Sequence, residues 1–211
     1  MIRFMPSDLS HLLCLGAHAD DIEIGAGGTV LRLLSEYPNV TVHWVVFSAI
    51  GEREVEAKRS AARFLRQARL PNVVTRDFRD GFFPYQGEAI KQAFEVLKGE
   101  IEPDLILTHR SRDAHQDHRL INELTWNTFR RHAILEFEIP KYDGDLGRPN
   151  VYFPLPEEIC QRKIDHLMAA FETQAGKHWF TSETFRALMR LRGIECGEPY
   201  AEAYYSRKLV I

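Results

Sequence analysis

Three side chains that can bind metals or move protons, His18, Asp20 and Asp21, occur within four residues of one another. The preceding apolar run, His11–Leu15, is typical of a buried strand, and the downstream run Val30–Leu34 is typical of a helix. In an open α/β sheet such a strand-to-helix turn lies at the carboxyl edge, where binding sites form. Imidazole and carboxylate groups at this spacing favour a divalent metal ion. The alternative is plain helix capping, because aspartate suits the positive end of a helix.

A second cluster of the same chemistry consists of His115, Asp117 and His118, and it follows the buried strand predicted at Asp104–His109. Parallel strands end at the same edge of a sheet, so we expect the two clusters to converge rather than to lie in separate solvated loops. Together they suffice for three metal ligands, a general base and a general acid. Spacing alone leaves open which aspartate binds the metal and which acts as the base.

The elements that must position these clusters alternate along the chain. Further strands are predicted at Val40–Ser48, Asn72–Phe78, Ile134–Ile139 and Tyr204–Ile211. Helices are predicted at Glu54–Ala68, Glu88–Glu102, Arg119–His132, Glu157–Thr173 and Ser182–Arg192. This alternation predicts an α/β fold with a Rossmann-like, mostly parallel sheet flanked by helices.

The chain organisation changes after the strand at Ile134–Ile139. The segment Pro140–Pro156 is rich in turn-forming residues and is predicted to be a loop over the sheet edge, with Tyr142–Arg148 shaping substrate access. Aromatic side chains suited to stacking on a sugar are Phe83, Tyr85 and Tyr142. We expect one domain over residues 1–211, made of a core at 1–139 and an irregular C-terminal elaboration at 140–211.

Composition narrows the class of protein. Apolar residues make up 45% of the 211 residues, which is enough for a core, and the formal net charge of −3 argues against a nucleic-acid binder that relies on bulk charge. The cysteines Cys14, Cys160 and Cys196 form no C-x-x-C pair, which fits a reducing compartment. Neither a secretory leader nor a membrane span is predicted. The expected location is therefore cytoplasmic, with the oligomeric state left open and a homo-oligomer compatible with the sequence.

The two motifs together resemble the PIG-L/LmbE-like deacetylase family. The resemblance rests on His18-Ala19-Asp20-Asp21, the glycines and Thr29 after it, and His115-Gln116-Asp117-His118 downstream. It covers the chain from about Leu12 to His118, and Ala19 stands where the family usually has proline. The resemblance implies a zinc-dependent hydrolase that removes the acetyl group from an N-acetyl amino sugar of the N-acetylglucosamine type or from its conjugate.

Carried over by position, the resemblance also implies a role for each residue. His18, Asp21 and His118 would bind the metal, Asp20 would be the general base, and His115 would stabilise or protonate the tetrahedral intermediate. Asp117 would orient His115. Two histidines and one carboxylate leave an open coordination position, as a catalytic Zn²⁺ site requires, although such a site can also hold Fe²⁺.

Three other residues match the positions of the family's functional residues less closely. Arg53 and Asp80 follow the second and third strands, where the resemblance implies contacts with the sugar, and each has a surface ion pair or turn position as its alternative. His109 ends a strand and is expected either as a buried structural histidine or behind the metal ligands.

Two further patterns have ordinary explanations. The run Gly25–Gly28 is interpreted as a tight backbone turn beneath the metal site, because Val30 occupies the position of the third glycine in a dinucleotide fingerprint. The basic residues between positions 58 and 69 favour a solvated helix face, with an anionic substrate or partner as the alternative (Lys58, Arg59, Arg63, Arg66 and Arg69).

Two rival functions follow from the same motifs. One is a different metal-dependent hydrolase, such as a phosphoesterase, which would usually require two metal ions and more carboxylates. The other is a catalytically silent sugar-binding relative, which would have no chemical need for ligands, base and acid together.

Overall fold

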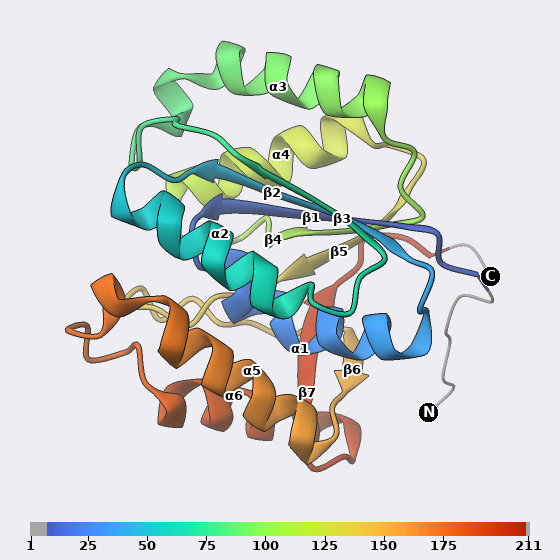
Figure 1. The fold of residues 1–211 in the computed structure, drawn as a ribbon, viewed down its shortest axis with the longest axis vertical. Coiled ribbons are helices and arrows are strands. Elements are labelled where there is room, and N and C mark those ends of the chain that lie inside the picture. Colours follow the sequence, from blue (N-terminus) through green and yellow to red (C-terminus); the bar gives the residue numbers. More distant parts are fainter. Residues whose placement is uncertain (1–7, 210–211) are drawn as a thin grey trace.

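A seven-stranded sheet organises residues 8–209, the part of the chain that the computed structural model describes (Figure 1). The strand order is β3-β2-β1-β4-β5-β7-β6. The strands are β1 (His11–His18), β2 (Thr41–Ser48), β3 (Leu70–Thr75), β4 (Leu105–His109), β5 (Ala133–Phe137), β6 (Val151–Pro154) and β7 (Ala201–Tyr205). The first five are parallel to one another, whereas β7 is antiparallel to β5 and β6. The predicted Rossmann-like, mostly parallel sheet is thus confirmed.

Helices cover both faces of the sheet, with α3 and α4 on one face and α1 and α2 on the other (Figure 1). On this second face α5 packs against α1 and α2, and α6 packs against α5 and the strands β6 and β7. Their bounds are α1 (Asp21–Glu36), α2 (Glu52–Phe64), α3 (Gly87–Glu100), α4 (Gln116–Thr128), α5 (Glu157–Ala170) and α6 (Ser182–Cys196). Two single 3₁₀ turns, η1 (Phe83–Tyr85) and η2 (Glu172–Gln174), lie in the connections.

The sheet has a separate apolar core on each face because successive strand residues point in opposite directions. Along β1, Leu13 and Leu15 join the core that includes Phe94 of α3 and Ile121 of α4. Leu12 and Cys14 instead join the larger core under α1, α2 and α5. Burial of β1 on both faces explains its continuous apolar run. It also fixes the position of His18, the last residue of the strand, at the carboxyl edge of the sheet.

The glycine-rich run after the first motif is helical, so its interpretation as a tight turn is wrong. Helix α1 begins at Asp21, the last residue of the motif, and Gly25, Gly27 and Gly28 lie inside it. Their small size serves close packing: a Cβ on Gly25 would lie 2.3 Å from Cδ2 of Phe137, and one on Gly27 would lie 2.6 Å from Cε1 of Phe64. The glycines therefore let the neighbouring elements approach a buried helix closely.

A buried ion pair from the C-terminal part holds α1 in place. Nζ of Lys163 lies 2.6 Å from Oε1 of Glu202 and 2.6 Å from the carbonyl oxygen of Ile24. The Glu202 carboxylate accepts hydrogen bonds from the backbone N–H groups of Gly28 and Thr29, at 2.8 and 2.7 Å. Helices and strands after residue 150 are thereby fixed to the helix that carries the first motif.

The C-terminal elements differ from expectation. The predicted loop Pro140–Pro156 contains the short edge strand β6, and the strand predicted at Tyr204–Ile211 instead occupies Ala201–Tyr205. Residues 210 and 211, and the N-terminal residues 1–7 on which the prediction of no leader rests, lie outside the described part. Among residues 8–209, no helix combines the length and apolar character needed to cross a bilayer.

Candidate active site

The two sequence motifs meet at the carboxyl edge of the sheet. Strand β1 ends at His18 and α1 begins at Asp21, while β4 ends at His109 and the N-terminal turn of α4 carries the second motif. They line an open pocket of about 620 Å³, to which later loops also contribute. The lining residues from those loops are Ile139, Lys141, Tyr142, Asp143, Gln174, Lys177 and Trp179. The convergence expected from the parallel topology is therefore present.

Three of the side chains present one potential ligand atom each to a common point. Nδ1 of His18 lies 3.1 Å from Nε2 of His118, and Oδ2 of Asp21 lies 3.3 and 3.5 Å from those two nitrogens. In a tetrahedral zinc site with bonds near 2.05 Å, the separation between neighbouring ligand atoms is about 3.3 Å. The donor set and its spacing therefore fit a tetrahedral ion of this size.

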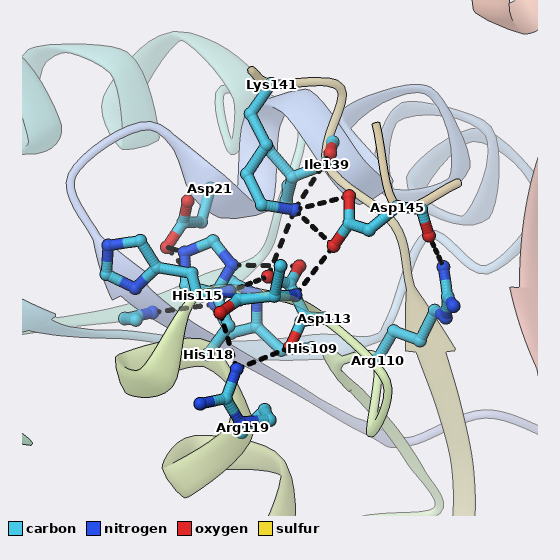
Figure 2. Close-up of polar contacts among 12 residues, drawn as sticks. Asp21, His109, Arg110, Asp113, His115, His118, Arg119, Ile139, Lys141 and Asp145 are labelled. Carbon is cyan, nitrogen blue, oxygen red and sulfur yellow. Dashed lines mark hydrogen bonds and ion pairs between the residues drawn. The ribbon is translucent and has the colours of Figure 1, made fainter. Parts of the chain in front are cut away.

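Carboxylates behind the two histidines fix which nitrogen faces the common point. Nε2 of His18 lies 3.0 Å from Oδ1 of Asp80 and 3.3 Å from Oδ2 of Asp117. Nδ1 of His118 lies 3.0 Å from Oδ2 of Asp113 (Figure 2). A proton on each of these outer nitrogens leaves the inner nitrogen with a free lone pair, which is the arrangement that metal-binding histidines usually have.

Burial and neighbouring charges shift the pKa values of Asp21, His118 and His18 in different directions. Burial alone would raise the pKa of Asp21, but His118, His109 and His18 outweigh it and hold that pKa well below its usual value. Burial, reinforced by His109, lowers the pKa of His118 to about 4, so this ring is neutral at pH 7. Burial also opposes charge on His18, yet Asp21, Asp117 and Asp80 raise its pKa well above the ordinary value. A metal at Nδ1 of His18 would therefore have to displace a proton.

Asp20 has different partners from its neighbour in sequence. Its Oδ1 accepts a hydrogen bond from Nη2 of Arg53 at 2.7 Å, and the side chain is almost completely buried. Burial and the charge of Asp21 raise the pKa of Asp20, while Arg53 opposes that rise. A carboxylate with a raised pKa that points into the pocket is suited to accept a proton.

His115 packs against both His18 and His118, with ring centroids 4.9 Å from His18 and 4.6 Å from His118. Its Nδ1 accepts a hydrogen bond from the backbone N–H of Asp117 at 3.3 Å, which leaves Nε2 to carry the proton. The expected orientation of His115 by the Asp117 carboxylate is not what is seen. That carboxylate instead accepts hydrogen bonds from Gly81 and Phe83 N–H groups, at 2.7 and 3.1 Å.

The two expected sugar contacts, Arg53 and Asp80, both line the pocket, but each already has a partner in the site. Arg53 contacts Asp20 and, through Nη1, Oε2 of Glu56 at 2.8 Å. Asp80 contacts His18, as described above. Sugar binding by these two residues stays a prediction, whereas their contacts with Asp20 and His18 are observed.

His109 lies behind Asp21 and His118, which is the second of the two positions expected for it. It is fully buried, its Nε2 lies 3.1 Å from Oδ2 of Asp21, and its ring stacks on His118 at 3.9 Å between centroids. Of the three aromatic residues expected at the sugar, Tyr142 lines the pocket, Phe83 is buried in the core, and Tyr85 is exposed away from the pocket lining.

Sequence reasoning missed Asp113, Lys141 and Trp179. The sequence does indicate Asp113 as a candidate, since it lies two residues before His115 in the same acid- and histidine-rich loop. Lys141 and Trp179 follow no motif, and only the folding of the C-terminal loops brings them to the pocket.

Comparison with known proteins gives a family match. The sequence profile of the family described as GlcNAc-PI de-N-acetylase, PIG-L, matches residues 13–129, which is more than half of the chain. A diacetylchitobiose deacetylase of Thermococcus kodakarensis is 28% identical over 127 residues, covering 54% of this chain and 46% of that protein. The match thus spans about half the length of that relative.

Solved structures share the fold. N,N'-diacetylchitobiose deacetylase from Pyrococcus horikoshii aligns with a TM-score of 0.75 at 19% identity, covering 94% of this chain and 84% of that one. GalB, the 4-carboxy-2-hydroxymuconate hydratase of Pseudomonas putida KT2440, aligns with a TM-score of 0.74 at 18% identity, covering 96% and 98%. Since these neighbours carry out different reactions, the shared fold does not identify the reaction.

Proposed function

This chain belongs to the PIG-L family, and from that premise we propose that it is a metal-dependent hydrolase that removes the acetyl group from an N-acetyl amino sugar or its conjugate. The observation that carries the proposal is that the adjacent residues Asp20 and Asp21 have different partners. Asp21 faces the two histidine nitrogens, whereas Asp20 is held off that cluster by Arg53. An amide hydrolase needs both a cation site and a separate base.

The proposed metal ligands are Nδ1 of His18, Oδ2 of Asp21 and Nε2 of His118. Zinc is the ion we propose, because two histidines and one carboxylate with an open position are typical of catalytic zinc, and Fe²⁺ is the alternative that this donor set also accepts. When bound, such an ion supplies Lewis acidity toward the acetamide carbonyl and makes a water molecule more acidic.

The chain's own groups handle the protons in this proposal. The Asp20 carboxylate accepts the proton of the attacking water, and Arg53 keeps that carboxylate charged and oriented. His115, with its proton on Nε2, donates toward the oxygen or the nitrogen of the amide as the tetrahedral intermediate forms and collapses. Both steps are needed because an amide is a weak electrophile with a poor leaving group.

The substrate class is proposed from the family and from the names of the relatives, which include a diacetylchitobiose deacetylase. The pocket volume of about 620 Å³ and the aromatic residues Tyr142 and Trp179 in its wall are compatible with a sugar ring. For the compartment we propose the cytoplasm, supported by the buried free thiols of Cys14, Cys160 and Cys196.

The test is acetate release from a panel of N-acetylglucosamine, N,N'-diacetylchitobiose and UDP-N-acetylglucosamine. We expect release from at least one of them, loss of activity after dialysis against a chelator, and recovery on adding one equivalent of Zn²⁺. Two tightly bound ions per chain together with hydrolysis of p-nitrophenyl phosphate would favour the phosphoesterase. Metal binding without turnover of any substrate would favour a silent relative.

A further inference from the structure

Lys141 is a nearly buried cation beside the metal-ligand cluster for which the proposed reaction has no use. Only 10% of its side chain is exposed, although it lies in the loop after β5. Its Nζ lies 3.0 Å from Oδ1 of Asp113 and 2.7 Å from Oδ2 of Asp145 (Figure 2). A lysine gives up hydration and side-chain freedom to occupy such a position, so the two acids must hold it firmly.

Asp113 connects Lys141 with the metal-ligand cluster. Its Oδ2 faces Nδ1 of His118 at 3.0 Å, and its Oδ1 accepts a hydrogen bond from the backbone N–H of His115 at 2.8 Å. The same Oδ1 faces Lys141, and the Asp113 side chain is only 2% exposed. Without Lys141, Oδ1 of this carboxylate would lose its ammonium partner and keep the N–H of His115, so the carboxylate facing His118 would be held less firmly.

The loop that carries Lys141 is also held by the Arg110 side chain and the Ala114 backbone, on either side of Asp113. Oδ2 of Asp145 accepts a hydrogen bond from the N–H of Ala114 at 2.7 Å, and the carbonyl oxygen of Asp145 accepts one from Arg110. Tyr142 and Asp143, directly after Lys141, line the pocket. The same short loop therefore forms part of the pocket wall and supports the carboxylate behind His118.

We infer that Lys141 is a positioning residue for the metal site and acts through Asp113 to hold the His118 ring with Nε2 toward the metal. The inference rests on the metal site of the proposed function. Its test measures metal affinity rather than acetate release, so the two proposals can fail separately.

The experiment measures the Zn²⁺ dissociation constant by competition with a chromophoric chelator for the parent, Lys141→Met, Asp113→Asn and the double variant. Loss of a group behind a metal ligand typically weakens metal binding about 10–100-fold, and we expect a loss in this range for each single variant. Because Lys141 acts through Asp113, the double variant should bind no more weakly than Asp113→Asn alone.

Matched variants separate positioning from charge and folding. Lys141→Arg keeps the cation and should recover most of the affinity, whereas Lys98→Met removes an exposed cation on α3 and should bind as the parent does. Should Lys141→Met fail to fold, Lys141→Gln removes the charge and keeps a polar end. Parent-like affinity in the charge-removing Lys141 variants, or additive losses in the double variant, would overturn the inference.

Discussion

Nη2 of Arg53 lies 2.7 Å from Oδ1 of Asp20, while Nη1 of the same guanidinium lies 2.8 Å from Oε2 of Glu56. Glu56 in turn accepts hydrogen bonds from the backbone and side chain of Thr173, at 2.8 and 2.7 Å. The proposed base is thus held by α2, and α2 is held by the loop after α5. A guanidinium so restrained fixes both the direction and the charge of the Asp20 carboxylate.

The first prediction concerns the pH dependence of activity. Arg53 lowers the pKa of Asp20 against the effect of burial, so Arg53→Met should raise that pKa. A base with a higher pKa stays protonated to higher pH, and the acidic limb of the kcat/KM profile should therefore move to higher pH. Arg53→Lys, which keeps a cation there, should move it less. An unchanged limb in Arg53→Met would show that Asp20 is not the group that titrates.

The second prediction concerns the buried pair that holds α1. Lys163→Met leaves the Glu202 carboxylate buried without its cation, and breaking such a pair typically lowers the free energy of unfolding by about 3–5 kcal/mol. Lys58→Met, which breaks the exposed pair with Glu54, should give no measurable change. Denaturant unfolding of the three proteins makes the comparison. Equal stability of Lys163→Met and the parent would contradict the role given to the pair.

The third prediction tests why α1 contains glycines. Gly25→Ala places a methyl group against Phe137 and should lower the free energy of unfolding by about 1–3 kcal/mol through overpacking. Gly99 lies in α3 with no neighbouring heavy atom within 4 Å of an added Cβ, so Gly99→Ala should stabilise by about 0.5–1 kcal/mol. If both variants shifted stability in the same direction, close packing would not explain Gly25.

The convergence of the two motifs could be predicted from the sequence because one rule governs it. His18 and His118 follow strands whose alternation with helices marks them as parallel, and parallel strands end at one edge. Asp113 could have been found by the same argument. Lys141 could not, since no periodicity or spacing connects a loop residue after β5 with His118, the proposed ligand on α4.

Two features of the fold were predicted wrongly from the sequence, and each error has a physical cause. A glycine run after a strand is typical of a turn, but here Gly25, Gly27 and Gly28 lie inside a helix buried on several sides, where small size matters more than conformational freedom. The edge strand β6 has four residues inside a proline- and glycine-rich segment, and it pairs with β7, which is distant in sequence. Local sequence patterns do not indicate a pairing between strands so far apart in the chain.

The central claim is that Asp20 acts as the base while Asp21 binds the metal, and one paired measurement tests it most directly. Acetate release and bound metal are determined for the parent, Asp20→Asn and His118→Ala. Asp20→Asn should keep its metal and lose activity about 10²–10⁴-fold, the usual contribution of a general base, whereas His118→Ala should lose the metal itself. Hydrolysis by Asp20→Asn at the parent rate would contradict the account.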